Sequence, residues 1–415
     1  MNFRFLCVSF MAMSIAVLCT ACSIDAKLIV NDSTSSNEKP YNTALISKIS
    51  AGANHTCLLK ADGSIWCWGE NSSGQLGDGG NIDSTSPVKV NDPGISYDSI
   101  SVSDNFSCGL TSHGAVRCWG NNGSGQLGNG QTADSNTPVQ VQGLDSGVIS
   151  VSASGEKWGN YGYACALLSD KTIKCWGHHP ANIGNGTTFS LTPVSFTGLT
   201  GVLQISTGRG HSCALLESKN VVCWGGNGSG QLGDGSGNNS ATPVQVSGLG
   251  NVKKVLTASS AWMNDGCSCA LLESGTVKCW GANPYGTLGN NDNSVTYSLV
   301  PVDVFGLTGI EDLALGYGND ANGNGTACAL HNSGDLFCWG SNSTGMIGNG
   351  SYVPTFKPLQ VGSLAGRQIG VAAGEGGDNG SGHVCALNNL GSYRCWGANY
   401  AGQLGDGTTN DRTTP

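Results

Sequence analysis

The chain has 415 residues, of which 11% are charged, and its formal net charge is −9. A chain with this charge lacks the basic face that binding to phosphate backbones requires, so nucleic acid is excluded as a partner. Its 18 cysteines are many for a reducing cytosol and indicate an oxidising compartment, in which disulfides form and persist.

Residues 1–21 are predicted to be a signal peptide. Arg4 precedes an apolar run that is too short and too close to the N-terminus to be an ordinary membrane span. Small residues and then Cys22 follow, which resembles a bacterial lipoprotein signal, in which the cysteine after the cleavage site is lipidated. Cys19 stands where such signals usually have leucine. Plain secretion, with cleavage after Ala21, is the alternative.

The next segment, residues 22–43, is rich in Ser and Asn and is predicted to be a flexible tether. With a lipid on Cys22, the protein is expected to be anchored in the bacterial cell envelope, at the outer membrane or the cell surface. Without the lipid, it would be secreted.

Residues 44–415 contain seven copies of one pattern, spaced 48 to 59 residues apart. Each copy has two cysteines ten residues apart, the second followed by Trp-Gly. A glycine-rich turn such as "GQLGDG" follows, and in six copies a segment such as "PVQV" comes next. In chain order, the cysteine pairs are Cys57 with Cys67, Cys108 with Cys118, Cys165 with Cys175, Cys213 with Cys223, Cys269 with Cys279, Cys328 with Cys338, and Cys385 with Cys395.

Each copy is predicted to form four short strands. "PVQV" alternates after a proline that can start a strand, and a segment such as "ISVS" alternates next. "CALL" and "VRCWG" type segments then flank a tight turn, and no stretch shows a sustained helical period. Four-stranded units repeated around an axis predict an all-β fold, a seven-bladed β-propeller, which hides its sheet edges by radial closure.

The ends of the repeat region bear on how this ring closes. The first copy begins at Ile49 without a preceding Pro-Val segment, and the seventh copy stops at Pro415. We therefore expect each repeat to be offset from its blade, with the chain end completing the first blade. The completing strand would come from residues beyond Pro415 or from Lys27–Val30.

Four motifs in combination, "HTCLL", "HSCALL", "CWGxNxxGQLGDG" and "PVQVxGL", resemble those of the regulator of chromosome condensation family, the RCC1-like seven-bladed propellers. The resemblance covers roughly residues 45–415. It implies four-stranded blades. It also implies two activities known in the family: guanine-nucleotide exchange on a small GTPase, and, in secreted bacterial members, inhibition of a β-lactamase.

The cysteine pairs fit a hairpin register. Cys57 and Cys67 are symmetric about Asp62, and Gly63 can take the left-handed position of a three-residue loop. Facing residues of an antiparallel pair lie about 4.5–5.5 Å apart, within disulfide range. Seven structural disulfides are therefore predicted, with Cys267 left over. The alternatives are a metal site, although each copy offers only two thiols, or cysteines that are simply small buried residues.

Partner binding is expected on one face of the ring. The connection before the first cysteine is expanded in copies three, five, six and seven, and alternating strand directions place these connections on the face that carries the glycine-rich turns. Aromatic and Met residues on the loops of a rigid scaffold suit protein or glycan contact. Alternatively, long loops bury their own aromatic residues. The predicted partner-binding residues are Trp158, Tyr161, Trp262, Met263 and Tyr317, with Tyr163 beside them.

Metal binding has weak support. Asp320, Asn322 and Asn324 match the start of an Asp-rich calcium loop, but the twelfth position is His331 instead of an acidic ligand. His178 and His179 are either metal ligands or solvated loop residues. No cofactor is predicted.

The remaining histidines and the absence of a catalytic pattern favour a non-catalytic role. The residues at the family's "HTC" position are expected to be structural hydrogen-bonding groups: His55, His211 and His383. No Ser/His/Asp set or carboxylate pair recurs at a meaningful spacing. We therefore predict a monomeric binding scaffold of the cell envelope whose loop-rich face engages a protein or glycan. The alternatives are nucleotide exchange on a small GTPase, inhibition of a secreted enzyme, or a hydrolase acting in the propeller mouth.

Overall fold

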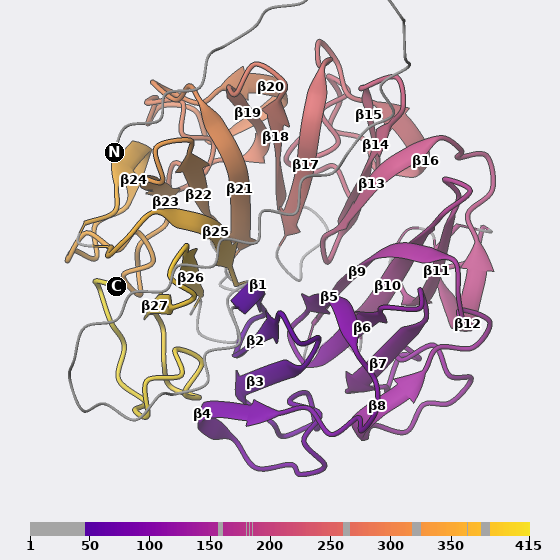
Figure 1. The fold of residues 1–415 in the computed structure, drawn as a ribbon. Coiled ribbons are helices and arrows are strands. Elements are labelled where there is room, and N and C mark those ends of the chain that lie inside the picture. Colours follow the sequence, from indigo (N-terminus) through magenta and orange to yellow (C-terminus); the bar gives the residue numbers. More distant parts are fainter. Residues whose placement is uncertain are drawn as a thin grey trace, which may run out of the picture. The chain divides into compact units, whose positions relative to one another are not determined.

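Strands that follow one another in the sequence lie side by side around a central axis (Figure 1). The computed structural model describes residues 46–156, 161–179, 181, 183–184, 186–259, 266–317, 325–362, 364–374 and 382–415. These belong to the second of two units in the chain, Thr43–Pro415. They form seven antiparallel sheets of consecutive strands, so the predicted all-β, seven-bladed propeller is confirmed. Within these residues, no helix is long and apolar enough to cross a membrane.

The first three blades each have four strands. Blade 1 contains β1 (Ile46–Ala51), β2 (His55–Lys60), β3 (Ile65–Gly69) and β4 (Ser84–Lys89). Blade 2 contains β5 (Tyr97–Val102), β6 (Phe106–Thr111), β7 (Val116–Gly120) and β8 (Ser135–Gln140). Blade 3 contains β9 (Val148–Glu156), β10 (Tyr161–Leu168), β11 (Ile173–His178) and β12 (Phe189–Ser195).

Blades 4 to 7 repeat this order from the axis outward. Blade 4 contains β13 (Val202–Thr207), β14 (His211–Leu216), β15 (Val221–Gly225) and β16 (Ser240–Gln245), and blade 5 contains β17 (Val252–Ser259), β18 (Gly266–Leu272), β19 (Val277–Ala282) and β20 (Tyr297–Asp303). Blade 6 contains β21 (Ile310–Tyr317), β22 (Gly325–His331), β23 (Leu336–Gly340) and β24 (Thr355–Gln360), and blade 7 contains β25 (Gln368–Ala373), β26 (His383–Asn388) and β27 (Tyr393–Gly397).

The central hairpin of each blade holds a disulfide. In blade 1, Gly63 adopts φ 79°, and this turn places Cys57 directly opposite Cys67. All seven pairs have Cα atoms 4.1 Å apart, the close spacing of facing residues that do not exchange backbone hydrogen bonds. The bonded pairs are those predicted: Cys57 with Cys67, Cys108 with Cys118, Cys165 with Cys175, Cys213 with Cys223, Cys269 with Cys279, Cys328 with Cys338, and Cys385 with Cys395.

These bonds contradict the two alternatives to disulfides. Paired sulfurs are not metal ligands, and the cysteines are not simply small buried residues. Loop closure gives each bond at most about 3 kcal/mol of stability. Cys267 is buried and stands outside the seven pairs.

An asparagine closes the long turn between the third and fourth strands. In blade 1, Asn71 accepts a hydrogen bond from the Leu76 backbone N–H (3.0 Å) and donates to the carbonyls of Gly80 (3.1 Å) and Ile82 (3.2 Å). One buried side chain therefore satisfies three backbone groups that lie outside the sheet. His179 stands at this position in blade 3 and is fully buried, so it is not the solvated loop residue considered above.

The core lies between neighbouring blades and is built around the seven Trp residues of the Cys-Trp-Gly motif. Trp119 of blade 2 packs against Cys57, Leu76 and other residues of blade 1, and its indole N–H donates to the Gln75 carbonyl at 3.0 Å. The same bond to the glycine-rich turn of the preceding blade is made by Trp68, Trp176, Trp280, Trp339 and Trp396. Among the described residues, the glycine-rich turns of six blades thus accept a hydrogen bond from the next blade's tryptophan.

The ring closes differently from the expectation. The Pro-Val segment of the first copy forms β4 of its own blade, with Val88 opposite Cys67, so the repeat is in phase with the blade and the predicted offset is wrong. The reason is that each long turn folds back antiparallel onto the Trp-Gly strand that precedes it. Blade 7 has three strands, and Arg412 bridges to Gly397 where an outer strand begins in the other blades.

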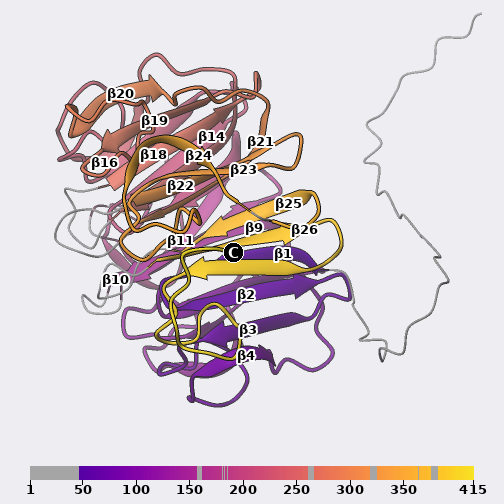
Figure 2. The ribbon, with the colours of Figure 1, turned by 90° about the vertical axis from the view of Figure 1, so that its left-hand side faces the viewer.

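Side chains join the last blade to the first. Figure 2 shows β25 and β26 beside β1 and β2. The Trp68 indole N–H donates to the Gln403 carbonyl at 2.9 Å, across 335 residues of chain. His383 contacts the Thr56 hydroxyl at 2.6 Å, and that hydroxyl donates to the same Gln403 carbonyl. Among the described residues, blades 7 and 1 share no sheet. Closure depends on these buried polar contacts, on a backbone hydrogen bond from the Gly407 N–H to the Thr85 carbonyl (2.9 Å), and on apolar packing around Trp68.

Candidate binding face

The propeller has two faces of different construction. The loop face carries the connections from the first to the second strand and from the third to the fourth strand of each blade. The hairpin face carries the tight hairpin turns and the connections between blades. The antiparallel order of every sheet fixes this division, so the expanded connections and the glycine-rich turns do share a face, as predicted.

Several predicted residues lie outside what the structure describes: Cys22, Trp158, Trp262, Met263, Asp320, Asn322 and Asn324. Tyr317 is described only by its backbone, as the last residue of β21. The binding, lipidation and calcium roles assigned to these residues therefore stay predictions.

The two described tyrosines of the expanded connection in blade 3 differ in environment. That connection is partly strand, because β9 and β10 extend beyond their counterparts and pair Glu156 with Tyr161. Tyr163 is buried, and its hydroxyl donates to the Gly208 carbonyl (2.9 Å) and lies 2.6 Å from the Ser212 hydroxyl in blade 4. Tyr163 thus joins two blades, as the buried-aromatic alternative expected, whereas Tyr161 is exposed.

Tyr161 belongs to a group of three aromatic rings at the loop-face end of blade 3. Its ring centroid lies 4.6 Å from that of His178, and His178 lies 6.1 Å from Phe189, edge to face. The three residues come from β10, β11 and β12, whose ends align here. We call them the blade 3 aromatic group.

A local change in hydrogen bonding explains how Phe189 fits there. In blade 1 the equivalent residue is Asp83, whose carboxylate accepts from the Asn71 backbone N–H at 2.8 Å. In blade 3, the Thr188 carbonyl accepts the corresponding N–H of His179 at 2.9 Å. The carboxylate is then dispensable, and an aromatic side chain can occupy the position and project into solvent.

Blades 5 and 6 expose a second set of apolar residues on the loop face. Tyr297 occupies the Asp83 position in blade 5, where the Thr296 carbonyl again replaces the carboxylate. Tyr352 and Val353 lie in the long turn of blade 6, and the Val353 side chain is 70% exposed. Sequence reasoning missed all three residues. Aligning the seven turns would have found Tyr297, because blades 1 and 2 have aspartate at that position.

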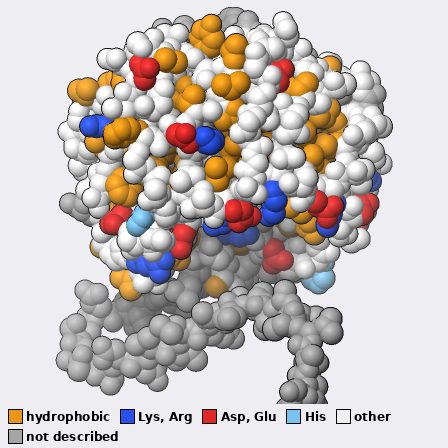
Figure 3. All heavy atoms as spheres, turned by 90° about the horizontal axis from the view of Figure 1, so that it is seen from above, with side chains coloured by type: hydrophobic (Ala, Val, Ile, Leu, Met, Phe, Trp, Pro, Cys, Tyr) orange, Lys and Arg blue, Asp and Glu red, His pale blue; other side chains and the backbone are white. Residues whose placement is uncertain are grey.

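Charge is distributed unequally between the faces. Figure 3 shows charged side chains in a band along one edge of the rim. Partly or fully exposed acids occupy the long turns. Those at the loop-face end are Asp83, Asp134, Asp292 and Asp411, whereas Asp78, Asp234 and Asp406 lie farther along the turns, which fold back toward the connections between blades. Among described residues, most Lys and Arg lie toward the hairpin face: Lys48, Lys60, Lys89, Arg117, Lys171, Lys174, Lys219, Lys253, Lys254, Lys278, Arg367 and Arg394.

The hairpin-face cations are largely neutralised by neighbours. Lys219 contacts Glu273 at 2.9 Å and Lys254 contacts Asp312 at 2.6 Å, each reaching the next blade, and Lys171 pairs with Glu217 in the same way. Exposed pairs of this kind add less than about 1 kcal/mol each to stability. Their main effect here is that the hairpin face has balanced charge while the loop face has an excess of negative charge.

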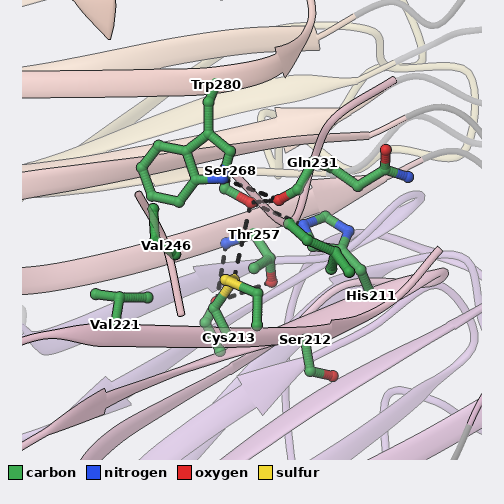
Figure 4. Close-up of a disulfide and its surroundings, with 12 residues drawn as sticks. His211, Ser212, Cys213, Val221, Gln231, Val246, Thr257, Ser268 and Trp280 are labelled. Atoms are coloured by element: carbon green, nitrogen blue, oxygen red, sulfur yellow. Dashed lines mark hydrogen bonds between the residues drawn. A yellow bond between two sulfur atoms is a disulfide. The ribbon is translucent and has the colours of Figure 1, made fainter. Parts of the chain in front are cut away.

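The "HTC" histidines have a structural role, as expected. His211 lies 2.8 Å from the Ser268 hydroxyl of blade 5, and that hydroxyl donates to the Gln231 carbonyl, the acceptor for Trp280 (Figure 4). His55 and His383 make equivalent contacts in blades 1 and 7. Because each hydroxyl donates to a carbonyl, it accepts from the imidazole Nε2–H.

Burial keeps these histidines neutral. Desolvation lowers the pKa of His55 to about 4 and that of His211 and His383 to about 3. The pKa of His179 is lowered to about 3 for the same reason, reinforced by His211 and His178. A permanently neutral imidazole inside a blade interface holds the fold together and does not exchange protons with a substrate at neutral pH.

The central channel is narrow. Its cavity of about 120 Å³ is lined by one small or medium residue from every innermost strand, including Ala51, Thr207 and Leu315. Ligand sites for drug-sized molecules are usually about 300–1,000 Å³. Near the channel, Arg209 of blade 4 forms a buried ion pair with Asp104 of blade 2 and donates to the Gly155 carbonyl. The residues near the channel are thus held together by contacts between blades.

The described residues contain no cluster of three or more His, Cys, Asp or Glu side chains placed to hold a metal ion.

Two family models match the chain, both described as regulator of chromosome condensation (RCC1) repeat. One matches residues 46–75, 97–126 and 202–231, and the other matches residues 62–110, 113–156, 220–264 and 333–387. The chain belongs to the RCC1 repeat family.

Individual relatives share the propeller and differ in size. The Arabidopsis thaliana ultraviolet-B receptor UVR8 is 26% identical over 374 residues, which is 89% of this chain and 69% of the receptor. The human E3 ubiquitin-protein ligase HERC2 is 30% identical over 364 residues, 86% of this chain but 7% of the ligase. This chain therefore spans only a small part of that much larger protein.

Two solved structures agree with the fold. Saccharomyces cerevisiae Prp20p, studied for its binding to Gsp1p and histones, superposes with a TM-score of 0.67 at 22% identity and covers 80% of each chain. Human WBSCR16 gives a TM-score of 0.68 at 23% identity, over 83% of this chain and 87% of the other. At these identities the likeness supports the fold alone.

Proposed function

We propose that this protein is a non-catalytic binding scaffold whose loop face engages a protein partner. The observation that carries the proposal is the exposure of Tyr297, Tyr352 and Val353 on neighbouring blades of that face. Tyrosine contributes large contact area together with a polar end, and exposed aromatic residues near the centre of an interface commonly dominate its affinity.

Family relationships support a protein as the partner. Prp20p is described by its binding to the proteins Gsp1p and histones, and this chain is similar to a small part of a much larger ligase. Guanine-nucleotide exchange and inhibition of a secreted enzyme are more specific forms of the same activity. Neither is favoured by a particular contact among the described residues, so the proposal stops at protein binding.

A matched pair of substitutions tests the loop face. Val353 is 70% exposed on the loop face and Leu390 is 69% exposed on the hairpin face, so aspartate at either position should cost the fold little. Val353→Asp is expected to weaken partner binding at least about tenfold, the effect of losing about 1.4 kcal/mol at an anchor. Binding is measured by surface plasmon resonance with the partner captured from cell-envelope extract by the wild-type protein.

Leu390→Asp serves as the control and should bind like the wild type. If Leu390→Asp abolishes binding and Val353→Asp does not, the hairpin face is the interface and the proposal is wrong. If both variants bind like the wild type, neither of these surfaces makes the contact, and the loop-face proposal also fails.

We further propose that the protein is exported and lipidated at Cys22. The seven disulfides among the described residues support an oxidising compartment. Cys22→Ala is expected to release the protein from the membrane fraction or to block its processing, because the acceptor thiol for the lipid is gone. Fractionation followed by mass spectrometry of the N-terminal peptide measures both results. A variant that is processed and membrane-bound like the wild type would disprove lipidation at this residue.

A further inference from the structure

We propose that the blade 3 aromatic group, Tyr161, His178 and Phe189, is a subsite for Lys or Arg side chains, so that the partner presents a basic segment to the loop face. This inference rests on the proposed function and adds the chemistry of the partner. It combines two independent observations, the geometry of the aromatic rings and the distribution of charge between the two faces.

The rings form an exposed aromatic surface. Tyr161 and His178 are tilted by 57° with centroids 4.6 Å apart, and Phe189 stands at 90° to His178. Tyr161 and Phe189 are both exposed, so solvent reaches these rings. A cation within about 6 Å of an aromatic ring face is attracted by the ring's quadrupole. A guanidinium or ammonium group could therefore rest on Tyr161 or Phe189.

This aromatic group is specific to blade 3. The equivalent positions of blade 1 hold Ala53, Glu70 and Asp83, of which Glu70 is buried and accepts hydrogen bonds from Asn54 (2.8 Å) and Ser72 (2.8 Å). The aromatic residues are therefore not a requirement of the repeat. In blade 3 a backbone carbonyl accepts the turn's N–H hydrogen bond that an aspartate side chain accepts in blade 1.

Charge complementarity identifies the class of partner. The long turn of blade 2, which carries the exposed Asp134, packs on β12, because the Gly130 N–H donates to the Leu191 carbonyl at 3.0 Å. Asp134 is fixed by accepting from the Asn122 N–H at 2.7 Å. Of the described cations toward the loop face, Arg209 is buried in an ion pair, Arg412 pairs with Asp406 at 2.5 Å, and Lys357 is exposed on blade 6, away from blade 3. The loop face thus attracts positive charge and the aromatic group can receive it.

An exposed aromatic surface could also stack against a sugar ring, and salt separates the two ligands. Attraction between an acidic face and a basic peptide weakens as ionic strength rises, because the Debye length shortens from about 30 Å at 0.01 M salt to about 8 Å at 0.15 M. Stacking of a neutral sugar carries no such dependence.

The test uses the full chain and three defined probes: a twelve-residue peptide alternating Gly with Lys and Arg, its Glu counterpart, and a neutral chitooligosaccharide. Titration calorimetry at low and physiological salt is expected to show binding of the basic peptide alone, weakened by salt. Tyr161→Ala and Phe189→Ala should each weaken binding about three- to tenfold, and Tyr161→Phe should restore it.

The control is Phe305→Ala. Phe305 is 53% exposed against 46% for Phe189, but it lies in a connection on the hairpin face, so this variant should bind the peptide like the wild type. The proposal is overturned if Tyr161→Ala and Phe189→Ala bind the basic peptide like the wild type, or if Phe305→Ala loses as much peptide affinity as they do. It is also overturned if the oligosaccharide binds and the basic peptide does not. If the peptide assay fails while Val353→Asp still abolishes capture of the partner, only this inference falls.

Discussion

Lowering the pH from 7.5 to 5 is expected to remove about 2 kcal/mol of unfolding free energy for each of four buried histidines, His55, His179, His211 and His383. The folded protein holds their pKa values at about 3 to 4. In the unfolded chain they return to about 6.5. The unfolded state therefore binds more protons throughout this range, so stability falls as the pH drops below 6.5. If the four titrate independently, the loss approaches the whole stability of a typical domain.

Carboxylates do not account for the same window. The pKa of Asp406 is lowered to about 2, with hydrogen bonds from Thr408 and Arg412 outweighing burial, which acts in the opposite direction. Its stabilising contribution is lost only as the pH falls below about 4, where the unfolded carboxylate begins to bind protons. The slope between pH 6.5 and 5 therefore belongs to the histidines.

Urea unfolding at a series of pH values measures the slope, which gives the number of protons taken up. His383→Gln should reduce the slope by about one proton and also lower stability at pH 7.5, because the contact with Thr56 is lost. The control is His113→Gln, which makes the same substitution at an exposed hairpin position and leaves all four buried histidines in place. A stability that stays constant from pH 7 to 5 would show that the histidines are not buried as described.

Trp68→Ala is expected to lower the free energy of unfolding by about 3–5 kcal/mol, the usual cost of removing a fully buried tryptophan. Trp68 is completely buried, stacks on Tyr393 with ring centroids 5.1 Å apart, and donates to the Gln403 carbonyl. The milder Trp68→Phe keeps an aromatic ring but removes the indole donor. The Gln403 carbonyl still accepts from the Thr56 hydroxyl, so the lost hydrogen bond costs about 0.5–1.5 kcal/mol, and the cavity left by the smaller ring adds to that cost.

The position of Trp68 adds a second expectation. Trp119 makes the same contact between blades 1 and 2, which are also joined by the chain. Trp68 joins blades 7 and 1, which in the described residues are held by side-chain contacts and by the backbone hydrogen bond from Gly407 to Thr85. Trp68→Phe should therefore accelerate amide hydrogen exchange in β1–β3 and β25–β27, whereas Trp119→Phe should affect blades 1 and 2.

Trp66, two residues before Trp68 on the same strand, offers a control. It is half-buried at the edge of the same apolar cluster as Trp68, and its indole N–H donates to the Ser64 hydroxyl of its own hairpin at 3.1 Å. Trp66→Phe keeps an aromatic ring in that cluster and removes a hydrogen bond that does not cross between blades, so it should change stability by less than about 1 kcal/mol. Equal losses for Trp66→Phe and Trp68→Phe, or exchange that is unchanged at the blade 7–blade 1 interface, would contradict the assigned role of Trp68 in ring closure.

The sequence by itself determined the features that depend on short-range regularity. The spacing of the Trp-Gly motifs predicted seven blades, and the ten-residue separation of Cys57 and Cys67 predicted the disulfides. Both follow from local geometry, because alternation along a strand and the symmetry of a hairpin decide which residues face each other. The division into a loop face and a hairpin face follows from the same alternation of strand direction.

The tertiary structure decided what depends on neighbouring blades. Tyr161 and Tyr163 are two residues apart on one strand, yet Tyr163 is buried because Ser212 of the next blade lies beside it, while Tyr161 is beyond that contact. The tertiary structure also decided which blade the Pro-Val segment joins. The segment pairs with the strand before it only because the long turn folds back. Exposure of Tyr352 and Val353, and closure through Trp68 and His383, likewise depend on contacts between segments that the local pattern does not relate.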